Sequence, residues 1–219
     1  VPLRRRAPPE AGTSVGQPTL VAAGGVDEGW LADTGTRFGW RSPTQRYGWS
    51  RTRPAVDRAW LDQPQWDEFV RMMPATTRST WSIDLPDGSY PVVIVMGDPT
   101  SRNQTNSITV AGQTILDPTP AEAGPNGYES GAFDGYCVQA RVRGGKLSIA
   151  PRHRGTGKAF DPKLCFIEIG PRGALMDAAT RARVAETVER MTQATAERRG
   201  RNASVRETAY GAYVDEPLM

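Results

Sequence analysis

Apolar and polar residues alternate most clearly in the middle of the chain. Residues 79–85 carry apolar side chains at positions 81, 83 and 85, and Pro86-Asp87-Gly88-Ser89 follows with residue types that tight turns prefer. A second apolar segment, 90–96, begins directly after this turn. The pattern predicts a β-hairpin over 79–96.

Shorter segments of the same character follow. Two pairs each flank a glycine turn: 107–110 with 113–116 around Ala111-Gly112, and 138–142 with 146–149 around Gly144-Gly145. They predict two further hairpins, and the alternating residues 164–169 predict a closing strand. Short strands at this spacing are typical of a β-sandwich or jelly roll, in which two sheets hide their apolar faces against each other.

The N-terminal third shows a different pattern. Residues 1–29 are rich in Pro, Gly and Ala, and they predict an extended arm with a short apolar patch at 20–23. Residues 30–73 scatter aromatic side chains among Gly, Pro, Asp and Arg. This mixture predicts loops and short strands, with a helical turn over 67–73.

A change of composition after Gly170-Pro171 predicts a helix. Residues 174–199 contain no Gly or Pro, and their apolar side chains recur at spacings of three and four. This stripe is too rich in alanine to bury much area alone, so it suits packing on the sandwich or on a partner. Residues 201–219 lack periodicity and predict a tail. The chain therefore divides into an arm (1–29), a sandwich (30–170) and a C-terminal helix with its tail (171–219).

Composition agrees with a mainly β chain. Gly 23 and Pro 18 in 219 residues, with a mean hydropathy of -0.51, favour turns and short strands over long helices. The 27 basic and 24 acidic residues are spread along the chain without a basic stripe, so nucleic acid is not an expected partner. The longest apolar run, 92–96, is far shorter than the ~18 residues that a membrane helix requires.

The start of the sequence and its two cysteines bear on location. Val1 precedes an Arg4-Arg5-Arg6 cluster, which fits a mature exported product, although trimming of a longer sequence explains it equally well. Cys137 and Cys165 lie on two predicted strands, which allows a disulfide in an oxidising compartment; two small buried thiols are the alternative. We expect a periplasmic, cell-surface or secreted location.

Several short motifs in the middle of the chain carry a family resemblance. They are Tyr47-Gly48-Trp49, Asp57-Arg58, residues 81–92, Gly97-Asp98-Pro99, residues 106–110 with Gly112, and residues 166–169. In this order and spacing the chain from Asp33 to Gly170 resembles malectin-like and galactose-binding-like carbohydrate-binding domains of bacterial extracellular proteins. The resemblance implies a jelly-roll sandwich without catalytic residues. The basic loop over 152–163 and the C-terminal helix depart from it, and no sugar-binding residue transfers.

The sequence offers only weak candidates for catalytic or metal-binding residues. The single histidine, His153, has no Gly-x-Ser-x-Gly elbow with it, and is expected to be a surface loop residue. The carboxylate pairs Asp84 with Asp87 and Asp57 with Asp62 would suit glycoside hydrolysis only across a cleft, for which no signal exists. Two cysteines and one histidine exclude a zinc cluster, while a structural calcium held by loop oxygens stays open without named ligands.

Aromatic loops are the best ligand candidates. A sugar ring stacks on an aromatic face while its hydroxyls bond to neighbouring polar groups. The residues predicted to form such a platform are Trp40, Arg46, Tyr47, Arg58, Trp60 and Trp66. The alternative is that tryptophans anchor the core. This alternative applies to Trp49 and Trp66, and it is preferred for Trp81.

The leading functional hypothesis is a non-catalytic docking module. In it the sandwich is an accessory or structural subunit, and the extended termini bind other proteins of a larger extracytoplasmic assembly. The second hypothesis is a secreted carbohydrate-binding domain that uses the aromatic loops. A carbohydrate-active hydrolase is a distant third.

Overall fold

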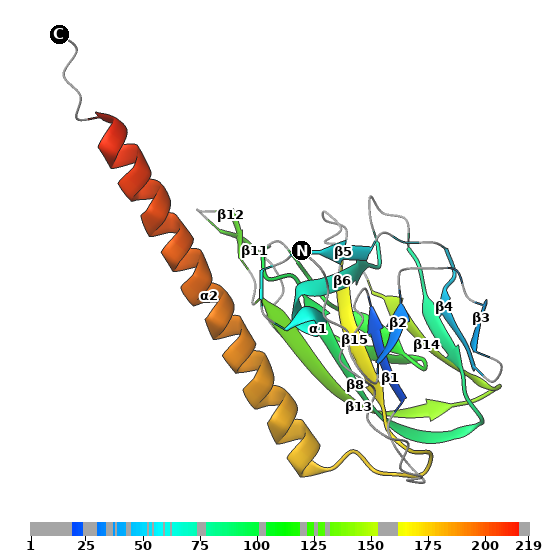
Figure 1. Ribbon diagram of the computed structural model, residues 1–219. Helices are drawn as coiled ribbons and strands as arrows, with labels where there is room; N and C mark the ends of the chain where they lie inside the picture. Colours follow the sequence, from blue (N-terminus) through cyan, green and yellow to red (C-terminus); the bar gives the residue numbers. More distant parts are fainter. Residues whose placement is uncertain are drawn as a thin grey trace, which may run out of the picture.

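Two sheets packed face to face form the body of the chain, and a long helix runs along one side (Figure 1). This arrangement confirms the predicted β-sandwich. The computed structural model describes residues 19–23, 30–33, 37, 39–42, 45–51, 53, 55–58, 60, 61, 63–73, 78–100, 104–118, 122–124, 127–129, 132–152 and 162–214.

The first sheet has seven strands. Their order is β13 (Phe133–Val142), β8 (Gly88–Gly97), β15 (Lys163–Ile169), β1 (Thr19–Ala23) and β2 (Trp30–Asp33), with β6 (Glu68–Arg71) on β15 and β5 (Ala55–Asp57) on β6. Only the pairing of β1 with β2 is parallel among the named strand pairs. The short helix α1 (Pro64–Asp67) leads into β6.

The second sheet has six strands. Their order is β10 (Gln113–Ile115), β9 (Ile108–Val110), β14 (Lys146–Pro151), β7 (Trp81–Asp84), β4 (Gln45–Trp49) and β3 (Gly39–Ser42). A separate ribbon pairs β11 (Glu122–Gly124) with β12 (Gly127–Glu129). The last described element is the helix α2 (Ala178–Val214).

Strand β8 contains an uninterrupted apolar run, 92–96, because both faces of the strand are buried. Ile94 and Met96 point into the core between the two sheets, where Trp49 and Trp81 are fully buried, which confirms the core position preferred for Trp81. Val93 and Val95 point the other way, into a second core. A strand that is covered on both faces has no solvent side on which to alternate.

The second core lies on the outer face of the seven-stranded sheet. Trp66 makes edge-to-face contacts there with Phe133 and Phe166, with ring centroids 5.1 and 5.3 Å apart. Val184 and Met191 of α2 complete this core. The helix is therefore packed on the sandwich through one part of its length.

Two of the three predicted hairpins are wrong. Residues 107–116 do form one, β9–β10, but β7 and β8 lie in different sheets, and so do β13 and β14. The turns at 86–89 and 144–145 are corners at which the chain crosses between sheets. Turn residues indicate that the chain reverses, but they do not indicate whether the two segments then pair. Here the half-polar β7 and the largely apolar β8 belong to differently covered sheets.

The structure differs from three other predictions in the type or the bounds of the element. The predicted helical turn over 67–73 is mostly strand β6, because Phe69 and Val70 are buried against the sheet. The apolar patch of the predicted arm forms β1, which pairs with β15. The C-terminal helix continues past Gly200 to Val214, since one glycine costs only about 1 kcal/mol among good helix formers.

Candidate functional site

The structure separates the residues predicted to form a sugar platform. Trp40 and Arg46 are register partners on β3 and β4, and the Trp40 side chain lies outside the described part of the structure. Tyr47 points into the sandwich core and is 3% exposed. Trp66 is 3% exposed in the second core. Neither of these two rings has a face open to a ligand.

Arg58, another predicted platform residue, binds a buried carboxylate. Its Nε and Nη2 donate to Oδ1 and Oδ2 of Asp98 at 3.1 and 2.7 Å. Lys163 Nζ lies 3.2 Å from the same Oδ2, and both cations sit over the Phe69 ring. The backbone N–H and hydroxyl of Thr100 donate to Oδ1 at 2.9 Å each. Asp98 therefore ties β8 to β15 and to the segment after β5.

The charge state of Asp98 follows from these partners. Burial alone would raise the pKa of its carboxyl, but the Arg58 hydrogen bonds, the Lys163 charge and the Thr100 hydrogen bonds together hold that pKa below its usual value. The carboxylate is ionised and fully bonded. We assign it a structural role, because a group whose lone pairs are occupied by protein donors has little capacity left for a ligand.

Asn106 is a second buried polar hub. Its backbone N–H and Nδ2 donate to Asp117 and Asp134 at 2.7 Å each, and its Oδ1 accepts the backbone N–H of Lys163 at 3.2 Å. Its carbonyl oxygen accepts the Tyr136 hydroxyl at 3.0 Å. Burial, with the charges of Asp134 and Asp117, raises the pKa of Tyr136. These bonds connect the start of β9 to both β13 and β15 across the sandwich.

The outer face of the six-stranded sheet is open and polar. Ser82 and Ser148 lie side by side on it, with their hydroxyl oxygens 2.9 Å apart. Asp84 lies at its edge, 3.6 Å from Arg46 and 3.9 Å from Lys146. Hydroxyls on such a surface can donate to and accept from the hydroxyls of a saccharide, and the cations can donate to them.

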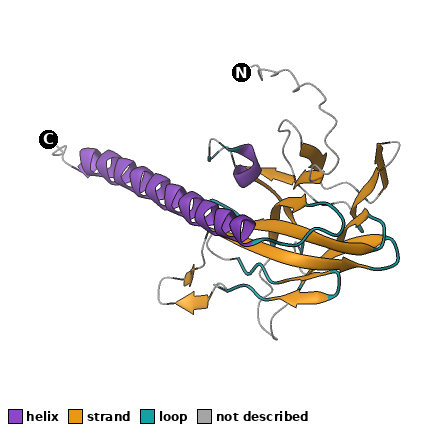
Figure 2. Ribbon diagram, turned by 90° about the horizontal axis from the view of Figure 1, so that it is seen from below, coloured by secondary structure: helices purple, strands orange, loops and turns teal. Residues whose placement is uncertain are grey.

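Helix α2 lies very close to β13 at Gly135. A Cβ at this position would lie 2.7 Å from Val184 Cγ1 and 2.8 Å from Val188 Cγ2, so only glycine lets the helix pack at this distance. Glycine inside a strand signals such an approach. Figure 2 shows the helix leaving the edge of the body and extending well past the sheets.

Arginines fix the helix to the loops farther along its length. Arg198 stacks over Trp60, with its guanidinium carbon 5.1 Å from the ring centroid, and donates to the Trp60 carbonyl oxygen. Arg199 donates to the carbonyl oxygen of Pro99 at 2.6 Å. Trp60, predicted as a sugar-binding residue, is half-buried and contacts α2 here.

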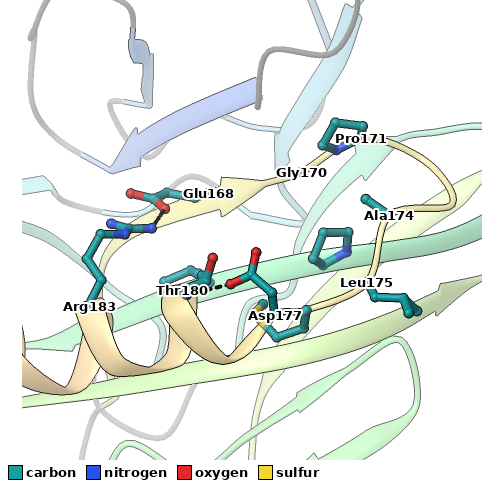
Figure 3. A pocket seen from close by; sticks show the side chains of 11 residues that line it. Glu168, Gly170, Pro171, Ala174, Leu175, Asp177, Thr180 and Arg183 are labelled. Carbon is teal, nitrogen blue, oxygen red and sulfur yellow. Dashed lines mark hydrogen bonds and ion pairs between the residues drawn. The ribbon is translucent and has the colours of Figure 1, made fainter.

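A small cavity lies where α2 begins (Figure 3). Asp177 accepts the backbone N–H of Thr180 at 2.6 Å and so caps the helix, and this hydrogen bond lowers the pKa of Asp177. Glu168 and Arg183 form an ion pair of 2.9 Å beside it. Leu175 is 78% exposed at its rim. The capped start fixes the direction in which the helix leaves the sheet.

Both cysteines are free thiols in the structure. Cys137 is on β13 and Cys165 on β15, with β8 between them, so about 9–10 Å separates the two strands. A disulfide needs Cα atoms within about 7 Å. Burial raises the pKa of both thiols, that of Cys165 strongly, which favours their protonated form.

The remaining candidates for catalysis or metal binding do not form a site in the described part of the structure. Asp87 accepts the backbone N–H of Gly145 at 2.6 Å and braces the turn, so it does not face Asp84 across a cleft. His153 and Asp62 lie outside the described residues. Across the described ranges no three side chains of His, Cys, Asp or Glu gather into a group that could hold a metal ion, and calcium stays a prediction. None of the described helices combines the length and apolar character of a membrane span.

Comparisons with known proteins give structural likenesses only. No protein-family model matches the chain, and no curated protein does. Solved structures that resemble it include the protein YXIM of Bacillus subtilis, at 18% identity and a TM-score of 0.47 over 70% of this chain and 40% of that one. A chain from the complex of the plant peptide RALF23 with FER and LLG2 matches at 15% identity and a TM-score of 0.49, over 70% and 39%.

A family 35 carbohydrate-binding module from Clostridium thermocellum is also similar, at 16% identity and a TM-score of 0.30, over 53% of this chain and 85% of that one. The chain spans about two fifths of the length of the first two structures. At these identities and TM-scores the likenesses say nothing about ligand, partner or activity.

Proposed function

We propose that the chain is a non-catalytic recognition module that docks onto a larger protein assembly outside the cytoplasm, with α2 as its docking element. The observation that carries the proposal is the projection of α2. This helix has 37 residues, and its end runs past the sandwich (Figure 1). A helix of that length spans about 55 Å.

The contacts of α2 with the body are described for the part of the helix before residue 203. Val184, Met191 and Thr195 are its buried side chains in the described stretch before residue 203, and Arg198 and Arg199 add bonds to the loops. Residues 201–214 continue for roughly 20 Å. A helical segment of this length is marginal by itself in water, so packing against another protein would stabilise it.

The described part of the body supports a non-catalytic role. Its most elaborate polar groups, around Asp98 and Asn106, are buried and bonded within the fold. Polar side chains used in this way stabilise and specify a structure. The proposed extracytoplasmic location is supported by the resemblance of the sequence to carbohydrate-binding domains of extracellular proteins.

Removing the projecting part of α2 tests the docking role. We expect a chain that ends at Arg201 to keep the melting temperature of the full chain, because it retains the described contacts with the body, from Val184 to Arg199. In extracts of the producing cell, the full chain should elute in a species several times larger than 23.8 kDa, and the shortened chain should elute as a monomer.

The matched control is Gly200→Ala, which retains the helix and should elute with the full chain. Co-elution of the shortened chain with the large species would remove α2 as the docking element.

A second candidate function is saccharide binding on the outer face of the six-stranded sheet. The open hydroxyl pair of Ser82 and Ser148 beside Arg46 favours it. On a glycan array we expect binding that weakens at least tenfold in Arg46→Ala and is unchanged in Arg51→Ala, an exposed arginine beyond the end of β4. Equal binding by both variants would argue against this surface.

A further inference from the structure

A hollow with a basic lining opens at one corner of the sandwich. It lies where β13 passes into β14 and where the β9–β10 turn approaches, and its volume is about 430 Å³. Its lining residues are Ala111, Gly112, Arg141, Arg143, Lys146 and Ser148. We propose that this hollow binds the carboxylate of an acidic sugar unit in a polysaccharide, an inference that rests on the second candidate function.

The fold gathers three cations at this corner. Arg141 is the second-last residue of β13 and Arg143 directly follows the strand, and both side chains line the hollow. Lys146 is the bridge partner of Arg143 across the Gly144-Gly145 turn, whose two residues have φ of +70° and +72°. All three side chains are exposed. Their mutual repulsion is relieved when an anion binds among them.

The described acidic groups nearby lie outside the lining of the hollow. None of the residues that line the hollow is acidic. Asp84 is 3.9 Å from Lys146, but it is shared with Arg46 at 3.6 Å. Asp87 is committed to the backbone N–H of Gly145. Two arginine forks with no carboxylate in the lining suit bidentate recognition of an incoming carboxylate.

The surroundings favour a sugar over other polyanions. Ser148 lines the hollow, and its hydroxyl contacts Ser82 on the open face, so hydroxyl groups continue directly from the cationic corner. A hexuronate unit carries a carboxylate and adjacent ring hydroxyls in one rigid ring, which matches this combination. A nucleic acid would need cations along a track, with aromatic side chains for its bases, and this lining has neither.

Calorimetric titration of the full chain with a galacturonate trisaccharide and with its methyl ester tests the inference. The two ligands differ only in the charge and methylation of the carboxyl groups. We expect the acid to bind at least tenfold more tightly than the ester, and raised salt to weaken only the acid. In Arg141→Gln/Arg143→Gln we expect at least a tenfold loss for the acid and no change for the ester.

Two exposed arginines elsewhere supply the matched control. Arg51→Gln/Arg78→Gln removes the same charge and should leave binding of the acid unchanged. Equal affinity for acid and ester, both lost in Arg46→Ala, would overturn the anion site and leave saccharide binding in place. Absence of binding to either ligand would overturn both. Equally tight binding of oligoglutamate or of single-stranded DNA would overturn the assignment to an acidic sugar.

Discussion

Replacing Asp98 with alanine is expected to lower the free energy of unfolding by about 3–5 kcal/mol. The carboxylate is fully buried between Arg58 and Lys163, and Lys163 is itself buried. Its removal leaves a cation in the core without its counter-charge, and such a charge keeps most of its desolvation cost. Urea unfolding of the two proteins measures the difference.

Asp84→Ala is the matched control for this variant. Asp84 also faces two cations, but its side chain is 35% exposed and its ion pairs are long, at 3.6 and 3.9 Å. We expect a loss below about 1 kcal/mol, as is typical of surface ion pairs. A loss of that small size for Asp98→Ala would refute the structural role given to this carboxylate.

The Asp98 contribution should also depend on pH. The folded state holds the pKa of this carboxyl below its ordinary value of ~3.9, which the unfolded chain retains. The stabilisation is therefore fully present above about pH 4 and is lost as pH falls through the lower folded-state pKa. The difference between wild type and Asp98→Ala should be constant from pH 7 to 5 and should shrink below pH ~4. A difference that grows in acid would contradict this sign.

Gly135→Leu is expected to displace α2 from the body while the sandwich stays folded. Even a methyl group at this position would overlap Val184 and Val188, and leucine adds more. The helix would lose burial of Val184 and Met191, roughly 1.5–3 kcal/mol for each buried side chain. A loss of about 3 kcal/mol corresponds to about a hundredfold faster amide exchange over residues 181–199.

Gln113→Leu places the same side chain at an exposed position on β10, in the other sheet. It should leave exchange in α2 unchanged. Unchanged exchange in Gly135→Leu as well would mean that the helix does not depend on its contact with β13.

Periodicity predicted the strands better than it predicted their partners. The alternation over 81–84 and the glycines at 112 and 144–145 mark strand ends and turns correctly. Whether a chain pairs after a turn or crosses to the other sheet depends on which faces are later covered. Here α2 covers the outer face of the seven-stranded sheet, and only its 178–199 part carried a helical pattern in the sequence.

The candidate site was harder to predict because its parts are far apart in sequence. Arg58 and Asp98 belong to separate motifs of the resemblance, and only the fold joins them in one ion pair. Gly135 inside a strand was a local signal for close approach. Arg141 and Arg143 looked like scattered charge until the corner at Gly144-Gly145 brought Lys146 beside them.

Hydrogen exchange along α2 in the isolated full chain tests the central claim most directly, because it distinguishes the part of the helix on the body from the part beyond it. We predict slow exchange over residues 181–199, where Val184, Met191 and Thr195 are buried, and fast exchange over residues 201–214, which become protected only in the assembled complex. Slow exchange over both stretches in an isolated monomer would show that the whole helix is stabilised by its own body, and would contradict the docking role.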